Sequence, residues 1–236
     1  MLYNLNLYNI LFLDIETVPA FENYDSLSEK MRKHWERKAS FLKSENEKTP
    51  EELYGRAGIY AEFGKIIVIS VGYFNRNEFR IKSFYGDDEK ELLLDFAQLL
   101  NRHYNQAESI MCAHNGKEFD FPYIARRMLI NGIELPDILQ IAGKKPWEIK
   151  HLDTMELWKF GDYKNYTSLD LLTTIFDIPT PKDDIDGSMV AKVYYEEKNL
   201  ERIKIYCQKD VLAIAQLMKK YLNQPLINED QIVIAE

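Results

Sequence analysis

Two acidic residues, Asp14 and Glu16, stand one residue apart behind an apolar run at residues 10–13. In an extended strand, positions i and i+2 point to the same face, so both carboxylates are expected on one side of a buried strand. Two like charges there repel, and a divalent metal cation is a compact group that would balance them. Strands also often end in solvated acids, and this alternative stays open for the pair taken alone.

Two later segments carry further acids. Asp120 follows an apolar segment at residues 109–113 after a short turn-forming run, at a place where a helix would begin and where Asp usually caps it. Asp210 lies four residues after Tyr206 in a helical pattern, and this spacing stacks the phenol and the carboxylate on one helix face. A Tyr at such spacing is most often at the edge of a core. Each motif alone therefore has a purely structural interpretation.

Taken together and in this order, the three motifs resemble those of the DEDD (DnaQ-like) 3'-5' exonuclease superfamily. They read FLDIET at residues 12–17, NGKEFD at residues 115–120 and YCQKD at residues 206–210. The tyrosine four residues before the last aspartate is similar to the tyrosine (DEDDy) branch, which contains the proofreading domains of family A and B DNA polymerases. The whole chain resembles stand-alone bacterial proteins related to the family B polymerase exonuclease domain.

The resemblance implies a metal-dependent 3'-5' exonuclease that removes nucleoside monophosphates from the 3' end of single-stranded or frayed DNA by two-metal-ion hydrolysis. Carboxylates suit two hard cations, Mg²⁺ or Mn²⁺, whereas surroundings poor in His and Cys disfavour zinc. The implied metal ligands, which are also catalytic residues, are Asp14, Glu16, Asp120 and Asp210. Tyr206 is the fifth catalytic residue. Since an unperturbed Tyr has a pKa near 10, it is expected to position the attacking water rather than to act as a general base.

Contacts to the substrate are also implied by the resemblance. Thr17, Asn115 and Phe119 match positions that touch the terminal nucleotide, although Phe119 could instead be a core residue under the following helix. Basic residues that could steer phosphates, or simply form solvated surface, are Arg126, Arg127, Lys144, Lys145 and Lys164. His151 and Asp153 end a short segment near the same sheet edge, where they could support the ligands.

Two other functions share these features. Ribonucleases of the same superfamily carry the same motifs, so a 3'-5' exoribonuclease is one alternative. The other is a non-catalytic module that binds nucleic acid or protein on a nuclease fold, with residues 20–64 as the docking surface for a protein partner. The presence of all five motif residues argues against the second alternative.

An α/β pattern of elements must position these residues. β-Branched and aromatic runs predict strands at residues 10–14, 66–74 and 78–85, the last two as an antiparallel hairpin, and short strands at 109–113 and 149–153. Apolar spacing predicts helices over residues 88–104, 121–131, 168–176, 187–198 and 201–221. The resemblance implies a ribonuclease-H-like fold, with a mixed sheet of hairpin strands followed by parallel strands and flanking helices.

The expected organisation is a single exonuclease domain over residues 1–223 followed by a C-terminal tail at 224–236. A helical insertion of about residues 20–64 follows the first strand. Charged residues at 26–43 predict one helix there. The run from Thr49 to Glu52 carries an N-cap, a first-turn proline and a glutamate at the third position, and it predicts the start of a second helix.

Composition limits the possible partners and compartment. The chain has 236 residues, is 46% hydrophobic and carries a net charge of −8. That acidity argues against coating nucleic acid by bulk electrostatics and favours gripping a short 3' end at a metal centre. Only two cysteines fit a reducing cytoplasm. No apolar run approaches the roughly 20 residues of a membrane span, and the start lacks a signal-peptide pattern. A soluble cytoplasmic protein with no membrane partner is expected.

Overall fold

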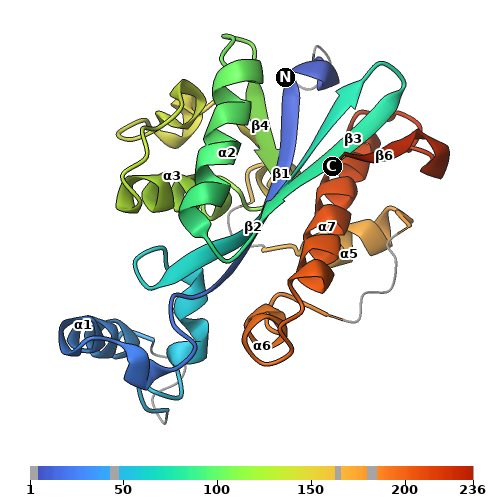
Figure 1. The fold of residues 1–236 in the computed structure, drawn as a ribbon. Helices are drawn as coiled ribbons and strands as arrows, with labels where there is room; N and C mark the ends of the chain where they lie inside the picture. Colours follow the sequence, from blue (N-terminus) through green and yellow to red (C-terminus); the bar gives the residue numbers. More distant parts are fainter. Residues whose placement is uncertain (1–4, 43–47, 163–165, 180–184, 236) are drawn as a thin grey trace.

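A six-stranded mixed sheet forms the centre of the computed structural model, which describes residues 5–42, 48–162, 166–179 and 185–235 (Figure 1). The strand order is β5-β4-β1-β2-β3-β6. The strands are β1 (Ile10–Pro19), β2 (Gly64–Asn75), β3 (Glu78–Tyr85), β4 (Ile110–Ala113), β5 (Leu152–Asp153) and β6 (Ile232–Ala235). β2 runs antiparallel to β1 and β3, whereas the β1–β4, β4–β5 and β3–β6 pairs are parallel.

The order β3-β2-β1-β4-β5, with only β2 reversed, is that of the ribonuclease-H-like fold, which confirms the predicted fold class. The predicted hairpin is confirmed too, with register kept from the Val68–Tyr85 pair to the Asn75–Glu78 pair. β-Branched residues fill β2 because both of its faces are covered by helices.

Helices cover the two faces of this sheet (Figure 1). α2 (Glu89–His103) and α3 (Asp120–Ile130) pack on one face, while α7 (Leu200–Tyr221) crosses the other. The short helices are α4 (Thr154–Lys159), α5 (Leu169–Ile175) and α6 (Val190–Tyr195). Each predicted helix outside the insertion is confirmed, with ends that differ by a few residues. In the described part of the chain, no helix has the length and apolar character needed to cross a bilayer.

The pleat of β1 assigns its side chains to the two faces as predicted. Leu11, Leu13 and Ile15 join the core beneath α2 and α3. Ile10 and Phe12 join the core beneath α7. The expectation that the strand ends at residue 14 is wrong, because pairing with β2 continues to Pro19 past an irregularity between Glu16 and Thr17.

The insertion packs beyond the C-terminal end of β1 and the N-terminal end of β2, around the fully buried Trp35 (Figure 1). Its first predicted helix is shorter than expected and forms α1 (Glu29–Ala39), capped by Ser28, which accepts a hydrogen bond from Met31 N. The prediction of a second α-helix in the insertion is wrong. Thr49 and Glu52 do bond reciprocally as a capping box, at 3.2 and 2.7 Å.

A 3-10 helix, η5 (Tyr54–Ile59), takes the place of that second helix. Two glycines, Gly55 and Gly58, weaken an α-helix in this segment because glycine loses the most backbone freedom on ordering. Gly58 is also required by close packing. A Cβ at this position would lie 2.9 Å from the carbonyl carbon of Val18. The 3-10 helix η5 therefore packs directly against the end of β1.

The segment 224–236, expected to be a tail, adds a strand to the sheet. Gln216 of α7 accepts from Ile227 N and donates to Ile227 O, both at 2.8 Å, and this fixes the turn after the helix. A 3-10 turn, η8 (Glu229–Gln231), then leads into β6, which pairs in parallel with β3. The pairing joins residues more than 150 positions apart, so no local pattern announces it.

Candidate active site

The first motif lies where β1 runs past the carboxyl end of its parallel neighbour β4. The paired residues of β1 and β4 end at Phe12 and Cys112, two residues before Asp14. Asp14 and Glu16 point to the α7 side of the sheet, where Glu16 is buried and Asp14 half-buried. Both acids are thus held by a central strand, as the sequence predicts, although they lie inside the strand rather than at its end.

The third motif reaches these acids from α7. A close approach between helix and sheet makes this possible, because a Cβ at Gly72 of β2 would lie 2.7 Å from the Val211 side chain. Cys207 then sits directly over the first motif. Its Sγ lies 3.3 Å from both the carbonyl oxygen and Oδ2 of Asp14. Tyr206 and Asp210 flank Cys207 on the same helix.

The second motif brings Asp120 to the same place. Asp120 is the first residue of α3, and the preceding position, Phe119, makes no side-chain cap. Asp120 therefore lies inside the first turn of the helix, and its structural and metal-ligand interpretations both stay predictions. Its carboxylate accepts hydrogen bonds from its own N–H and from the N–H of Ile15, which lies between Asp14 and Glu16 on β1.

Electrostatics confirm that the four acids form one cluster. Burial raises the pKa of Asp14 well above its ordinary value, and the charges of Asp210, Glu16 and Asp120 raise it further. Burial, then Asp210 and Asp120, raise the pKa of Glu16 in the same way. Asp120 has its pKa raised to about 8, chiefly by burial. A cluster of this kind is costly unless a cation compensates it.

The donor atoms of the cluster fit hard divalent cations. Four carboxylates offer only oxygen ligands, which Mg²⁺ and Mn²⁺ prefer. Potential ligand atoms of Asp14, Glu16 and Cys207 lie within 4.8 Å of one another. Burial raises the pKa of the Cys207 thiol well above its ordinary value, so the thiol keeps its proton and donates a hydrogen bond to Asp14.

Tyr206 adds a hydroxyl at the edge of the cluster. Burial raises its pKa, and the charges of Asp210, Glu16 and Asp14 add to the shift, as does a hydrogen bond to Asp210. The phenol therefore stays protonated at neutral pH. The i,i+4 spacing of Tyr206 and Asp210 places both groups on one face of α7, as predicted.

Asp153 supports the second motif, a role that the sequence only suggests. It is 2% exposed, and its carboxylate accepts from the backbone N–H groups of Asn115 and Lys117 at 2.9 and 3.1 Å. It also caps α4 through Met155 N and Glu156 N. One buried carboxylate thus fixes the turn that leads to Asp120. Its position at the end of a short predicted strand is the signal that pointed to it.

His151, in contrast, lies away from the acid cluster. Its Nδ1 accepts from Met111 N at 3.2 Å and its Nε2 lies 2.9 Å from Ile138 O, so the ring is held neutral. Burial lowers its pKa to about 4. It links β5 to β4 and to the segment after α3.

The predicted substrate residues lie beside the acids. Asn115 adopts a positive φ of 62°, and its buried Oδ1 has no hydrogen-bond partner in the described part of the chain. Thr17 is half-buried and bonds to the hydroxyl of Tyr123. Phe119 packs on Tyr123, with ring centroids 5.3 Å apart, and also lines a groove together with Glu16 and Thr17. The core interpretation of Phe119 is thus confirmed in part, and its contact with a nucleotide stays a prediction.

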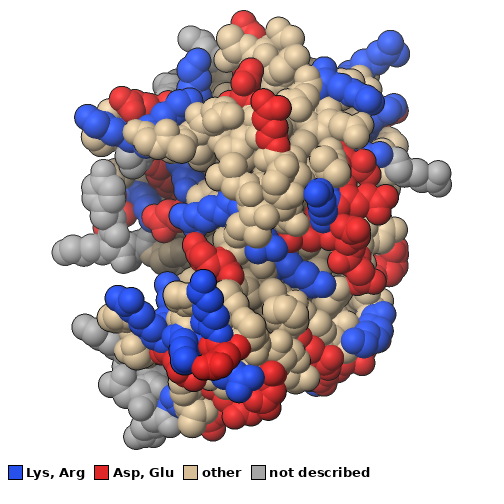
Figure 2. All heavy atoms as spheres, turned by 60° about the vertical axis from the view of Figure 1, so that its left-hand side comes forward, with Lys and Arg blue, Asp and Glu red and all other residues tan. Residues whose placement is uncertain are grey.

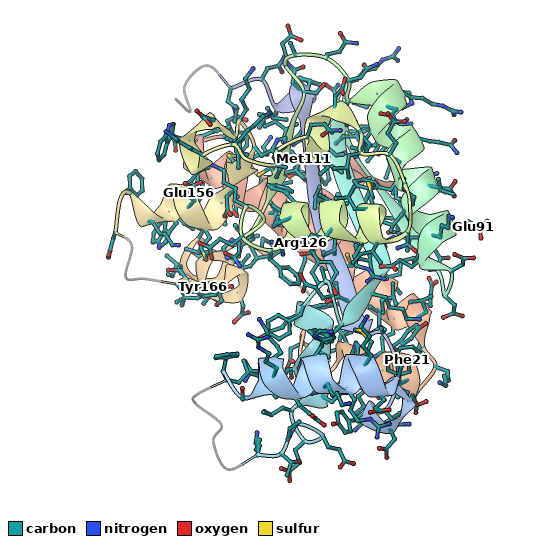
Figure 3. All side chains as sticks on the ribbon, turned by 90° about the vertical axis from the view of Figure 1, so that its left-hand side faces the viewer. Phe21, Glu91, Met111, Arg126, Glu156 and Tyr166 are labelled. Carbon is teal, nitrogen blue, oxygen red and sulfur yellow. The ribbon has the colours of Figure 1, made fainter. Side chains whose placement is uncertain are left out.

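An exposed aromatic residue near the cluster was missed from the sequence. Tyr166 leads into α5, toward the left-hand side of Figure 3, and is 70% exposed. Partial burial raises its pKa, followed by the charges of Glu118, Asp153 and Asp120, which places the phenol close to the second motif. No motif surrounds it in the sequence, so only the folded chain reveals it.

The basic residues proposed to steer phosphates divide into two groups. Arg127 is not available for this role, because its guanidinium bonds both carboxylate oxygens of Glu89, at 2.8 and 2.5 Å, and Ala61 O at 2.8 Å. Arg126, Lys144 and Lys145 are exposed. Lys164 lies outside the described residues.

Comparison with known proteins agrees with this geometry. Residues 59–223, more than half of the chain, match a family described as a predicted 3'-5' exonuclease related to the exonuclease domain of PolB. This match includes Asp120, Tyr206 and Asp210 and begins after the first motif. A similar protein is a DNA polymerase of Desulfurococcus sp. (strain Tok), 21% identical over 181 residues, which are 68% of this chain and 23% of the polymerase.

The chain thus spans less than a quarter of the length of that polymerase. The family match covers more than half of this chain and agrees with its fold, so it establishes the family of the chain. The chain belongs to the family of predicted 3'-5' exonucleases related to the exonuclease domain of PolB.

Proposed function

We propose that the protein is a metal-dependent 3'-5' exonuclease of the tyrosine (DEDDy) branch that shortens single-stranded or frayed DNA from its 3' end. The observation that carries this proposal is the meeting of Asp14, Glu16, Asp120 and Asp210. They come from β1, α3 and α7, and burial, followed by the charges of neighbouring acids, raises the pKa values of Asp14, Glu16 and Asp120. Buried acids with perturbed pKa values are typical of functional sites, and bound cations would compensate their charge.

Asp14, Glu16, Asp120 and Asp210 would hold two divalent cations, Mg²⁺ or Mn²⁺. Cations bound there supply a hydroxide nucleophile at neutral pH and relieve the charge on the leaving 3'-oxygen. The protein contributes rigid positions for the four carboxylates. Ile15 N–H holds Asp120, and Cys207 holds Asp14.

Tyr206 would orient the attacking water. Its phenol keeps its proton because its pKa is raised, so it can donate or accept a hydrogen bond but cannot serve as a general base. Replacing its hydroxyl should lower the rate while leaving the carboxylates intact.

Thr17, Asn115 and Phe119 would contact the terminal nucleotide. The unpartnered buried Oδ1 of Asn115 is a hydrogen-bond acceptor that a substrate hydroxyl can satisfy. Phe119 offers a half-buried ring in the groove, where stacking on a base would contribute about 1–3 kcal/mol. Tyr166 is a further exposed ring near the second motif.

DNA is the proposed substrate because the similar protein named above is a DNA polymerase. A proofreading role with a polymerase partner is one form of this function. The exoribonuclease and the non-catalytic binding module become outcomes of the test.

The test uses 5'-labelled single-stranded DNA and RNA of the same sequence, incubated in parallel with Mg²⁺ or Mn²⁺. We expect a ladder shortened from the 3' end on DNA, abolished by EDTA and by Asp14→Ala. Asp95→Ala, an exposed acid on α2, is the matched control and should retain activity. Shortening of RNA alone would mean that the substrate is RNA. If neither metal gives a ladder that depends on Asp14, the proposed exonuclease activity is wrong.

A further inference from the structure

A groove of about 790 Å³ connects the acid site with the insertion. Glu16, Thr17 and Phe119 of the site line it. The insertion contributes η5 to one side, and α6 contributes the other side. The residues used below are Arg56 and Ile59 from η5 and Lys192 and Tyr195 from α6.

The η5 side of the groove is fixed in place by α3. The hydroxyl of Tyr123 donates to Gly58 O at 2.7 Å, and the same hydroxyl bonds to Thr17. A Cβ at Gly64 would lie 2.3 Å from that hydroxyl, so the backbone is packed tightly around it. A residue of the site and a wall of the groove therefore share one buried tyrosine.

The α6 side is also tied to the sheet. Tyr195 donates to Pro19 O at 2.6 Å, and Tyr194 donates to Asp87 Oδ1 at 2.6 Å. Lys65 of β2 donates to the Tyr194 hydroxyl at 2.9 Å. Since both sides are held by hydrogen bonds to the sheet or to α3, the space between them is set by the fold.

The lining suits an unpaired strand of nucleic acid. Arg56 and Lys192 contribute one cation from η5 and one from α6, and Ile59, Phe119 and Tyr195 contribute apolar or aromatic groups, a combination that serves phosphates and bases. Glu22 and Glu196 also line the groove, so phosphate contacts are confined to the two cations. On the face of the molecule drawn in Figure 2, Lys and Arg are interspersed with Asp and Glu, without one continuous basic surface for a duplex.

The η5 helix lies almost entirely before the matched segment, which begins at residue 59. Building on the exonuclease activity proposed above, we propose that this groove holds the unpaired strand next to the reacting 3' end. Arg56 and Lys192 contact its phosphates, and the insertion restricts the enzyme to ends that are already unpaired.

Binding can be tested without hydrolysis. We would measure fluorescence anisotropy of a 5'-labelled oligothymidylate in Ca²⁺, with a gel to show that the strand stays intact. Arg56→Ala and Lys192→Ala should each weaken binding about 3–10-fold and lower the salt slope by about 0.7. Lys30→Ala, an exposed lysine of α1 in the same insertion and not in the groove, should bind as the wild type does.

Selectivity is tested with the same 3' end left unpaired or paired in a blunt hairpin. The wild type should act on the unpaired end faster, by about tenfold for each base pair that must open. If both groove variants bind the strand as the wild type does while Asp14-dependent shortening is intact, the proposed role of the groove is wrong and the proposed exonuclease activity is still supported. Weaker binding by both groove variants without any hydrolysis would support the groove and overturn the exonuclease.

Discussion

Two buried groups of charged residues in this molecule differ in how their charges are balanced. Around Glu89 and Arg127 each charge meets an opposite charge or a polar partner. Glu89 also accepts from Ile66 N at 2.7 Å and Asn131 Nδ2 at 3.0 Å. Around Asp14 and Asp120, like charges gather in a buried place, and burial, followed by the charges of neighbouring acids, raises the pKa values of both residues.

The contrast separates architecture from function. The Glu89 group joins α2, α3, β2 and the insertion, and its charges are balanced within the chain. The acid group has a charge that the carboxylates themselves do not balance, so it lowers stability until cations bind. A buried charge cluster therefore indicates a site when its members repel, and a structural joint when they pair.

Breaking the paired group should have the largest effect on stability. Arg127→Ala leaves Glu89 buried without its cation and should lower the free energy of unfolding by about 3–5 kcal/mol. Denaturant unfolding followed by circular dichroism measures it. Arg126→Ala, the exposed neighbour on α3 (Figure 3), should change it by less than about 0.5 kcal/mol. Equal effects of the two variants would remove the distinction drawn above.

Relieving the repelling group should act in the opposite direction. Asp120→Asn keeps the acceptor for Ile15 N–H but has no carboxylate to neutralise on folding, so in EDTA it should stabilise the protein by about 1–2 kcal/mol. For a chain of this size, each kcal/mol raises Tm by about 2–4 °C. The same variant should lose most of the Tm rise that Mn²⁺ gives the wild type. A lower Tm in EDTA would contradict the account of the acid group.

Removing a hydrogen bond that holds an acid of this group in place should have a smaller effect, which is on metal affinity. Cys207 bonds to Asp14, and Ser70 of β2 bonds to Cys207. Ser70 in turn lies 2.9 Å from Ser83 of β3. Losing one such bond costs about 0.5–1.5 kcal/mol, so Cys207→Ala should weaken Mn²⁺ binding by about 2–10-fold in calorimetry. Cys207→Ser, which keeps a donor, should recover part of the loss, and Cys112→Ala, which is buried elsewhere, should leave the affinity unchanged.

A further effect concerns the dependence of stability on pH in EDTA. Because the folded pKa of Asp120 is raised to about 8, the folded state binds more protons than the unfolded state between the ordinary value and 8. Stability should thus rise as pH falls from 8 to 6.5, by at most about 1.4 kcal/mol per pH unit for one proton. Below 6.5 the neutral His151, with its pKa lowered to about 4, opposes the trend. A Tm that falls between pH 8 and 6.5 would contradict this.

Local patterns in the sequence predicted much of the fold. The pleat faces of β1, the β2–β3 hairpin and the long helices follow from side-chain periodicity, which is a local property. The failures share a different cause. β6 depends on pairing with β3, and η5 depends on the packing of Gly58 against β1, so both are decided by distant parts of the chain.

The candidate site could be predicted only in part for the same reason. The five motif residues are recognisable because their types and order resemble a family. Nothing near Arg127 indicates that it bonds Glu89, and nothing near Tyr166 indicates that the acids lie beside it. Side chains whose role depends on a long-range partner require the structure.

The contact between Asp14 and Cys207 has a consequence for how the protein is made. These residues are separated by 193 positions, and synthesis at about 5–20 residues per second puts roughly 10–40 s between them. During that interval the acids of β1 are in water and carry their ordinary charge. A nascent chain without α7 therefore lacks a complete site, and any nuclease activity begins only after the last helix has left the ribosome.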